Sequence, residues 1–132
     1  MKTITRSILI SMLMIFAASA YAESGLQAIQ IFECEFEDDG TADKLLAASS
    51  AWLKVARTTK GCENLNVAIR YPIAEGGEGA SDFKFVITMP TFTEWGMFTD
   101  AYEDSAVKAA DANFEGIASC TSSTMWEGIR VK

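Results

Sequence analysis

The sequence predicts a single α+β domain with the element order β-α-β-β-α-β. Three observations support this fold class. Extended segments alternate between apolar and polar residues, as strands do, and two other segments repeat apolar residues at helical spacing. The chain of 132 residues is also long enough for one domain with a substantial core and too short for two, with a hydrophobic content of 49%.

Residues 1–22 have the pattern of a secretory signal peptide. A basic lead with Lys2 and Arg6 precedes the apolar run Ile8–Ala18, and Ala20-Tyr21-Ala22 offers small residues at the cleavage positions. The apolar run is shorter than the roughly 20 residues that span a bilayer. We therefore expect cleavage before Glu23, a periplasmic or secreted domain of residues 23–132, and no membrane association after cleavage.

The first strand and the first helix are predicted at residues 26–61. Leu26–Phe36 alternates, with one side formed by Ala28, Phe32, Cys34 and Phe36 and the other by Ile29, Ile31, Glu33 and Glu35. Asp38-Asp39-Gly40 then forms a turn, and Thr41 can cap a helix that ends near Lys60-Gly61. The apolar stripe of this helix is Leu45, Ala48, Trp52, Val55 and Ala56.

Two further strands are predicted on either side of a glycine-rich loop. Leu65–Tyr71 places its odd-numbered apolar residues on one face, and Phe83–Met89 does the same. The segment Ala74–Asp82 contains three glycines and connects the two strands. Pro90 ends the third strand.

The second helical region and the last strand follow. Thr91 and Glu94 have the spacing of a capping box, so a helix should begin here with Trp95, Phe98 and Tyr102 facing inward. Asp104-Ser105 is expected to interrupt it and to cap a short helical piece that extends to Ala112. After Gly116, the sequence predicts a terminal strand at Thr124–Val131.

Right-handed connections turn this order into a four-stranded antiparallel sheet, strand order 4-1-3-2, with both helices on one face. This is the ferredoxin-like arrangement. One layer of helices leaves the other face of the sheet bare, and that face carries the apolar residues Ile29, Ile31, Ala68 and Val86. We therefore expect a homodimer packed sheet to sheet, which is a dimeric α+β barrel.

Gly61-Cys62 after the first helix and Phe92-Thr93-Glu94-Trp95 at the start of the second resemble motifs of a known family. This family is the antibiotic-biosynthesis-monooxygenase and stress-responsive group of dimeric α+β barrels. The resemblance runs from Leu26 to the end of the chain and implies the same barrel. Its members include cofactor-free oxygenases, haem degraders and proteins with no established reaction.

The resemblance also bears on activity. Family members often carry a His on the second helix beyond the Trp, where this chain offers Tyr102. The sequence contains no His at all, so haem degradation by the family's His-ligated route is not expected. The family's cofactor-free oxygenases use an Asn, a Trp and an Arg around a polyketide-like substrate, and this chain contains residues of each type.

Charge and composition exclude several further function classes. The net charge is −7 and becomes −9 without residues 1–22, because that segment carries two basic and no acidic residues. Nucleic acid is therefore not expected as a partner. The absence of His removes the usual general base and the commonest zinc ligand. We expect neither a metal nor another cofactor.

The bare face of the sheet carries the candidate ligand-binding residues. Its cations suit an anionic or carbonyl-bearing ligand, and its aromatic residue can stack on one. The alternative is that these charges pair across the dimer interface and specify it. The candidates are Glu33, Asn66, Arg70, Lys84, Trp126 and Arg130.

The predicted function is binding of a small, partly apolar molecule by an exported homodimer. One alternative is a cofactor-independent monooxygenase acting on an aromatic or polyketide-like substrate, in which Arg70 or Arg130 stabilises an enolate. The other is a non-catalytic structural or regulatory dimer.

An odd number of cysteines leaves at least one thiol outside any intrachain bridge. The predicted topology brings the end of the first strand beside the start of the fourth, and so brings Cys34 and Cys120 to one end of the sheet. A disulfide between them is a further prediction, with Cys62 as a buried free thiol.

Overall fold

The computed structural model describes residues 25–73 and 81–129. The predicted signal peptide, its cleavage site and the candidate Arg130 lie outside the described residues. The elements in chain order are β1 (Leu26–Phe36), α1 (Ala42–Ala56), β2 (Asn66–Arg70), β3 (Phe83–Met89), α2 (Phe92–Tyr102), α3 (Ala106–Ala110), the 3-10 helix η1 (Asp111–Phe114) and β4 (Ala118–Ile129).

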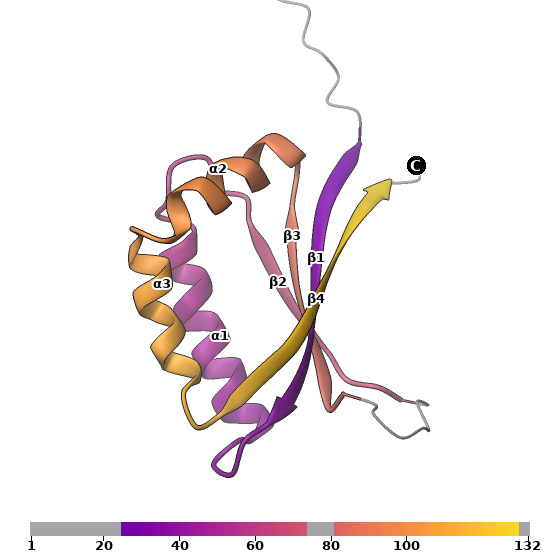
Figure 1. Ribbon diagram of the computed structural model, residues 1–132, viewed down its shortest axis with the longest axis vertical. Helices are drawn as coiled ribbons and strands as arrows, with labels where there is room; N and C mark the ends of the chain where they lie inside the picture. Colours follow the sequence, from indigo (N-terminus) through magenta and orange to yellow (C-terminus); the bar gives the residue numbers. More distant parts are fainter. Residues whose placement is uncertain (1–24, 74–80, 130–132) are drawn as a thin grey trace, which may run out of the picture.

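The four strands form one antiparallel sheet in the order β2-β3-β1-β4. All the helices lie on the same side of this sheet (Figure 1). The predicted α+β, ferredoxin-like fold class is therefore confirmed, including the strand order. No helix among the described residues is long and apolar enough to cross a membrane.

Apolar side chains on the helix-facing side of the sheet form the core. The largest that are fully buried come from the sheet, from the helices and from the turn after α1: Phe83, Leu45, Leu65, Met89 and Val107. Burial of such side chains contributes about 1.5–3 kcal/mol each. The alternation in β1 and β3 and the stripe on α1 thus predict correctly which side chains face inward.

Hydroxyl side chains begin the three α-helices. The Thr41 hydroxyl accepts a hydrogen bond from the Lys44 backbone N–H at 3.3 Å, and the Thr91 hydroxyl accepts one from the Glu94 backbone N–H at 3.1 Å. The Thr91 hydroxyl also donates to the Glu94 carboxylate at 3.1 Å. Ser105 caps α3. Each cap satisfies backbone donors that a helix start leaves unpaired.

Two predicted boundaries were wrong. Helix α1 ends at Ala56 and not near Lys60, because the chain leaves it through successive turns that end at Gly61, whose φ of 85° favours glycine. Strand β4 begins at Ala118 and not at Thr124. Most of the side chains of this edge strand are exposed, so its sequence shows no alternation between a buried and an open face.

Strands β1 and β4 are also joined covalently. A disulfide connects Cys34 to Cys120, which are partners in the β1–β4 pairing. The register of this pairing shifts between Glu33 and Cys34, so one extra β4 residue lies next to the bridge. Cys62 is a buried free thiol.

Candidate functional site

A cavity of about 570 Å³ lies between the sheet and the helical layer. Its size is within the range of small-molecule sites in proteins, about 300–1,000 Å³. Most of its wall is apolar and aromatic, and residues from every element except β2 and α3 contribute to it. The wall consists of Gln30, Phe32, Leu45, Trp52, Phe83, Phe85, Ile87, Phe98, Thr99, Tyr102, Asp111, Phe114, Ala118 and Cys120.

Aromatic rings of this wall contact one another edge to face. The Trp52 ring lies 6.0 Å from that of Phe85 and 6.1 Å from that of Phe98, centroid to centroid. Phe85 also meets Phe114 at 5.7 Å with an interplanar angle of 84°. Such pairs add about 0.5–1.5 kcal/mol beyond the area that they bury. The wall is therefore held in shape by contacts between α1, α2, β3 and η1.

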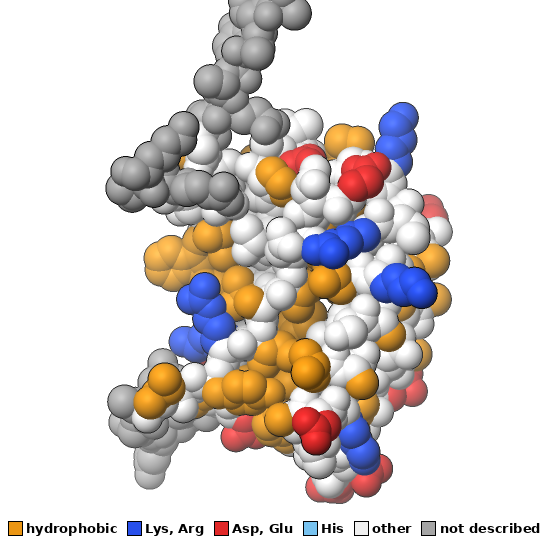
Figure 2. All heavy atoms as spheres, turned by 180° about the vertical axis from the view of Figure 1, so that it is seen from behind, with side chains coloured by type: hydrophobic (Ala, Val, Ile, Leu, Met, Phe, Trp, Pro, Cys, Tyr) orange, Lys and Arg blue, Asp and Glu red, His pale blue; other side chains and the backbone are white. Residues whose placement is uncertain are grey.

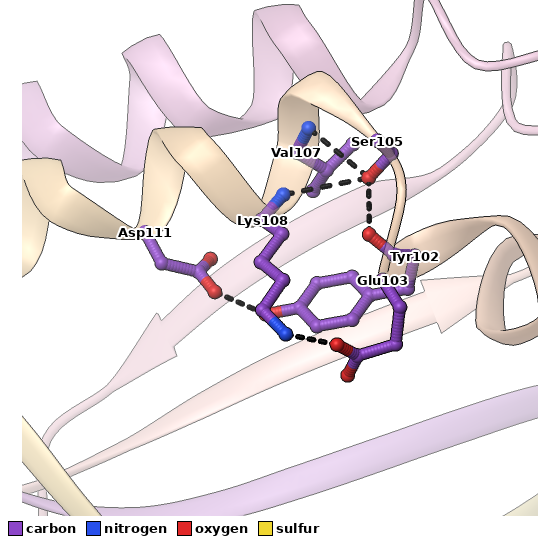
Figure 3. A network of polar contacts seen from close by, with 6 residues as sticks. All are labelled: Tyr102, Glu103, Ser105, Val107, Lys108 and Asp111. Atoms are coloured by element: carbon purple, nitrogen blue, oxygen red, sulfur yellow. Dashed lines mark hydrogen bonds and ion pairs between the residues drawn. The ribbon is translucent and has the colours of Figure 1, made fainter.

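One corner of the cavity is polar and is built around the carboxylate of Asp111. The indole N–H of Trp52 donates to one carboxylate oxygen at 2.8 Å. The hydroxyl of Tyr102 donates to the other oxygen (Figure 3). Asp111 is thus held from two sides by residues of α1 and α2.

The turn between α2 and α3 brings Asp111 back onto Tyr102. The Ser105 hydroxyl donates to the Tyr102 carbonyl at 2.7 Å and accepts from the backbone N–H groups of Val107 and Lys108 (Figure 3). These bonds fix the direction in which α3 leaves, and η1 continues it with Asp111 as its first residue. Local cap chemistry therefore positions this carboxylate.

The Tyr102 hydroxyl is a hydrogen-bond donor at neutral pH. Burial raises the pKa of Tyr102 above the ordinary value, and the hydrogen bond to Asp111 raises this pKa further. The phenol therefore does not serve as a base near neutrality. Its oxygen retains lone pairs that can accept a hydrogen bond from a ligand.

A second polar group enters the cavity from the sheet. Gln30 lies on the helix-facing side of β1, between Ala28 and Phe32, and lines the cavity. Its side-chain amide makes no hydrogen bond within the described part of the chain. An amide supplies both donors and acceptors, so Gln30 can bind a polar group of a ligand. No cluster of metal-ligating residues occurs among the described residues.

Another apolar hollow lies between α1 and the edge strand β2. Hydrophobic side chains gather at this seam when the molecule is seen from behind (Figure 2). The hollow has a volume of about 350 Å³, and Asp43 and Tyr71 are among the residues that line it. The hydroxyl groups of its two serines, Ser49 and Ser50, are bonded to helix carbonyls.

The candidate ligand-binding residues that the structure describes lie on the opposite face of the sheet and not in the cavity. Arg70, Lys84 and Glu33 follow one another across β2, β3 and β1. Lys84 contacts Glu33 at 3.5 Å, and the Ser81 hydroxyl donates to Glu33 at 2.7 Å. Lys84 lies between Arg70 and Glu33 in the register.

Asn66 and Trp126 lie farther along the same face, in a second row that also contains Thr88 and Ile29. Asn66 accepts a hydrogen bond from the Arg57 guanidinium at 2.8 Å. Trp126 is 57% exposed, and its indole donates to Thr124. The sheet thus brings Arg70, Lys84 and Glu33 together, and it separates Asn66 and Trp126 by two strands.

Sequence reasoning missed the polar residues of the cavity. Two signals could have found them. Gln30 interrupts an otherwise apolar inward face of β1, and Asp111 falls on the helical stripe that Val107, Ala110 and Phe114 share. A polar residue on an apolar face indicates a place where the cost of burying a polar group must be offset by hydrogen bonds, either within the protein or to a ligand.

Comparison with known protein families finds no matching family model. Comparison with curated proteins finds no match either.

Solved structures with a similar backbone exist at low sequence identity. A dimeric ferredoxin-like protein of unknown function from Thermobifida fusca YX is 18% identical, with 80% of this chain and 92% of that chain covered and a TM-score of 0.46. A dimeric protein of unknown function and ferredoxin-like fold from Bacteroides fragilis NCTC 9343 is 11% identical, with 80% and 95% covered and a TM-score of 0.42.

A mutant chlorite dismutase from Candidatus Nitrospira defluvii is 10% identical. It is matched over 83% of this chain and 42% of that chain, with a TM-score of 0.38. At these identities the likeness concerns the backbone fold alone.

Proposed function

We propose that this protein is an exported homodimer that binds a small, partly apolar molecule in the cavity between its sheet and its helices. The observation that carries the proposal is the cavity itself, with a volume of about 570 Å³. Protein interiors are packed as densely as organic crystals, so most apolar side chains are covered by other protein atoms. This cavity is open to solvent and leaves part of its aromatic wall uncovered, so a ligand that fills it would remove apolar surface from water.

The composition of the wall supports a partly apolar ligand. Aromatic rings from five elements surround most of the space, so apolar surface of the ligand would be removed from water. Asp111 and Gln30 supply polar contacts at separate points of the wall and would fix the orientation of the ligand.

The homodimer is supported by the face of the sheet that carries no helices. Ile29 and Ile31 lie half-buried on this face, together with the ion pair of Glu33 and Lys84. Apolar residues on an uncovered sheet face favour burial against a second layer. A second copy of the chain supplies that layer with two-fold symmetry. The open-face residues are then interface residues, or contacts for a molecule held between the two sheets.

A cofactor-independent monooxygenase is less well supported. That hypothesis places Arg70 or Arg130 at a developing enolate, and Arg70 lies on the sheet face opposite to the cavity. No Arg is among the described residues of the cavity wall. The geometry therefore supports ligand binding, with Asp111 as the charged group of the site, better than it supports oxygenation of a substrate.

Blocking the cavity tests the proposal. Ala118 lines the cavity from β4, and Ser119 is its neighbour on the other side of the same strand. Protein purified from the secreted or periplasmic fraction should retain a small molecule in native mass spectrometry, and Ala118→Phe should abolish that retention. Ser119→Phe is the matched control and should retain it. Absence of any bound molecule, together with no binding of apolar probes, would reject the proposed function.

Export and assembly are tested separately. Amino-terminal sequencing of the exported protein should begin at Glu23, and an intact Met1 would reject the signal peptide. Sedimentation at micromolar concentration should give the mass of a dimer. A folded monomer under these conditions would reject the homodimer.

A further inference from the structure

We propose that the ligand of the cavity is an organic cation, namely an aromatic or alkyl amine in its ammonium form, bound by Asp111. This inference rests on the proposed function and specifies its ligand. It follows from the charge of the polar corner, from the rings around it, and from the hydrogen-bonding capacity that the corner leaves unused.

The charge of the corner is uncompensated within the described residues. Asp111 is partly buried and accepts two hydrogen bonds, but no Lys or Arg of the described chain forms an ion pair with it. The nearby Lys108 is paired with Glu103 at the surface instead (Figure 3). A carboxylate in a largely apolar wall is costly unless a cation meets it.

The aromatic wall favours the same kind of ligand. The rings of Trp52, Phe98 and Tyr102 line the cavity beside the carboxylate, and Trp52 and Tyr102 are the residues that hold it. The faces of such rings attract cations, most strongly where water is excluded. An anion would meet both the carboxylate and the negative ring faces, so the corner discriminates against it.

The hydrogen-bonding pattern of this corner favours a ligand that donates hydrogen bonds. The donors of Trp52 and Tyr102 at this corner are both directed at Asp111. What remains available is acceptor capacity on the Asp111 carboxylate and on the Tyr102 hydroxyl oxygen. An ammonium N–H group can donate to both, and charge-assisted hydrogen bonds of this kind are the stronger ones.

A matched series of probes tests the inference at neutral pH. Naphthylmethylamine, naphthylmethanol and naphthoate share one apolar body and differ in charge, and their affinities are measured by isothermal titration calorimetry. The amine should bind at least about tenfold more tightly than the alcohol, and naphthoate should bind most weakly. Equal affinity of the amine and the alcohol would overturn the inference and leave the proposed function standing. Failure of all three probes to bind would overturn the inference, and together with the absence of a retained molecule in native mass spectrometry it would also reject the proposed function.

Substitutions assign the preference to Asp111. Asp111→Asn keeps the shape of the side chain and should bring the affinity of the amine to within about twofold of that of the alcohol. Asp100→Asn removes an exposed carboxylate on α2 and should change neither affinity. Tyr102→Phe keeps the Asp111 charge and should keep the preference for the amine, which tests the inference if Asp111→Asn does not fold. Loss of the preference in Asp100→Asn, or its persistence in Asp111→Asn, would overturn the assignment.

Discussion

Removal of the Cys34–Cys120 disulfide should strongly destabilise the domain. The two cysteines are 86 residues apart in the sequence, so the bridge restricts most of the unfolded chain. In the chain-entropy description, closing a loop of this length contributes about 4.6 kcal/mol at 25 °C. That amount is a large fraction of the 5–15 kcal/mol typical of whole domains.

Cys120→Ser is the least disruptive way to break the bridge. Cys120 is exposed, whereas Cys34 is fully buried. The variant therefore leaves Cys34 packed in the core as a thiol, and a free Cys packs there as a small hydrophobic residue. The change in the free energy of unfolding then reports on the cross-link and not on a new cavity.

Urea unfolding followed by circular dichroism gives the magnitude. Cys120→Ser should lose about 4–5 kcal/mol relative to the oxidised wild type, and the reduced wild type should match the variant. Reductant should have no effect on Cys120→Ser itself, which controls for damage to other parts of the protein. A loss below about 1 kcal/mol, or a count of three free thiols per chain in denatured, non-reduced wild type, would refute the reasoning.

Three other substitutions test separate parts of the structure. The pKa of Tyr102 is raised in the folded state, so above about pH 10 the unfolded chain releases this proton first and the wild type should lose stability. Tyr102→Phe should lose less stability over the same pH range. Equal alkaline losses of the two proteins in urea titrations would contradict this. Gly61→Ala should lower the free energy of unfolding by about 1–2 kcal/mol, because Gly61 has a φ of 85° and an added Cβ would meet the Met97 side chain. An unchanged midpoint of thermal unfolding would contradict this expectation. Ile31→Lys places a charge on the open face of the sheet and should yield a folded monomer in sedimentation, whereas a persistent dimer would show that this face is not the interface.

The fold was predictable because its main signals are local. The inward alternation of β1 and β3, the stripe on α1 and the hydroxyl caps at Thr41 and Thr91 each depend on residues a few positions apart. Together with the handedness of the connections, they fix the order of the strands in the sheet. The terminal strand was predicted, but its start at Ala118 was not, because most side chains of this edge strand are exposed and such a strand has no reason to alternate.

The cavity was decided only by the tertiary structure. Trp52 and Asp111 are 59 residues apart, and they meet because the cap at Ser105 and the packing of α3 against α1 bring η1 over the cavity. Local sequence patterns extend over a few residues and cannot predict a contact across this separation. The sequence therefore determined which faces are apolar, through short-range periodicity. The structure decided where the polar residues on those faces converge, because that depends on how whole elements pack.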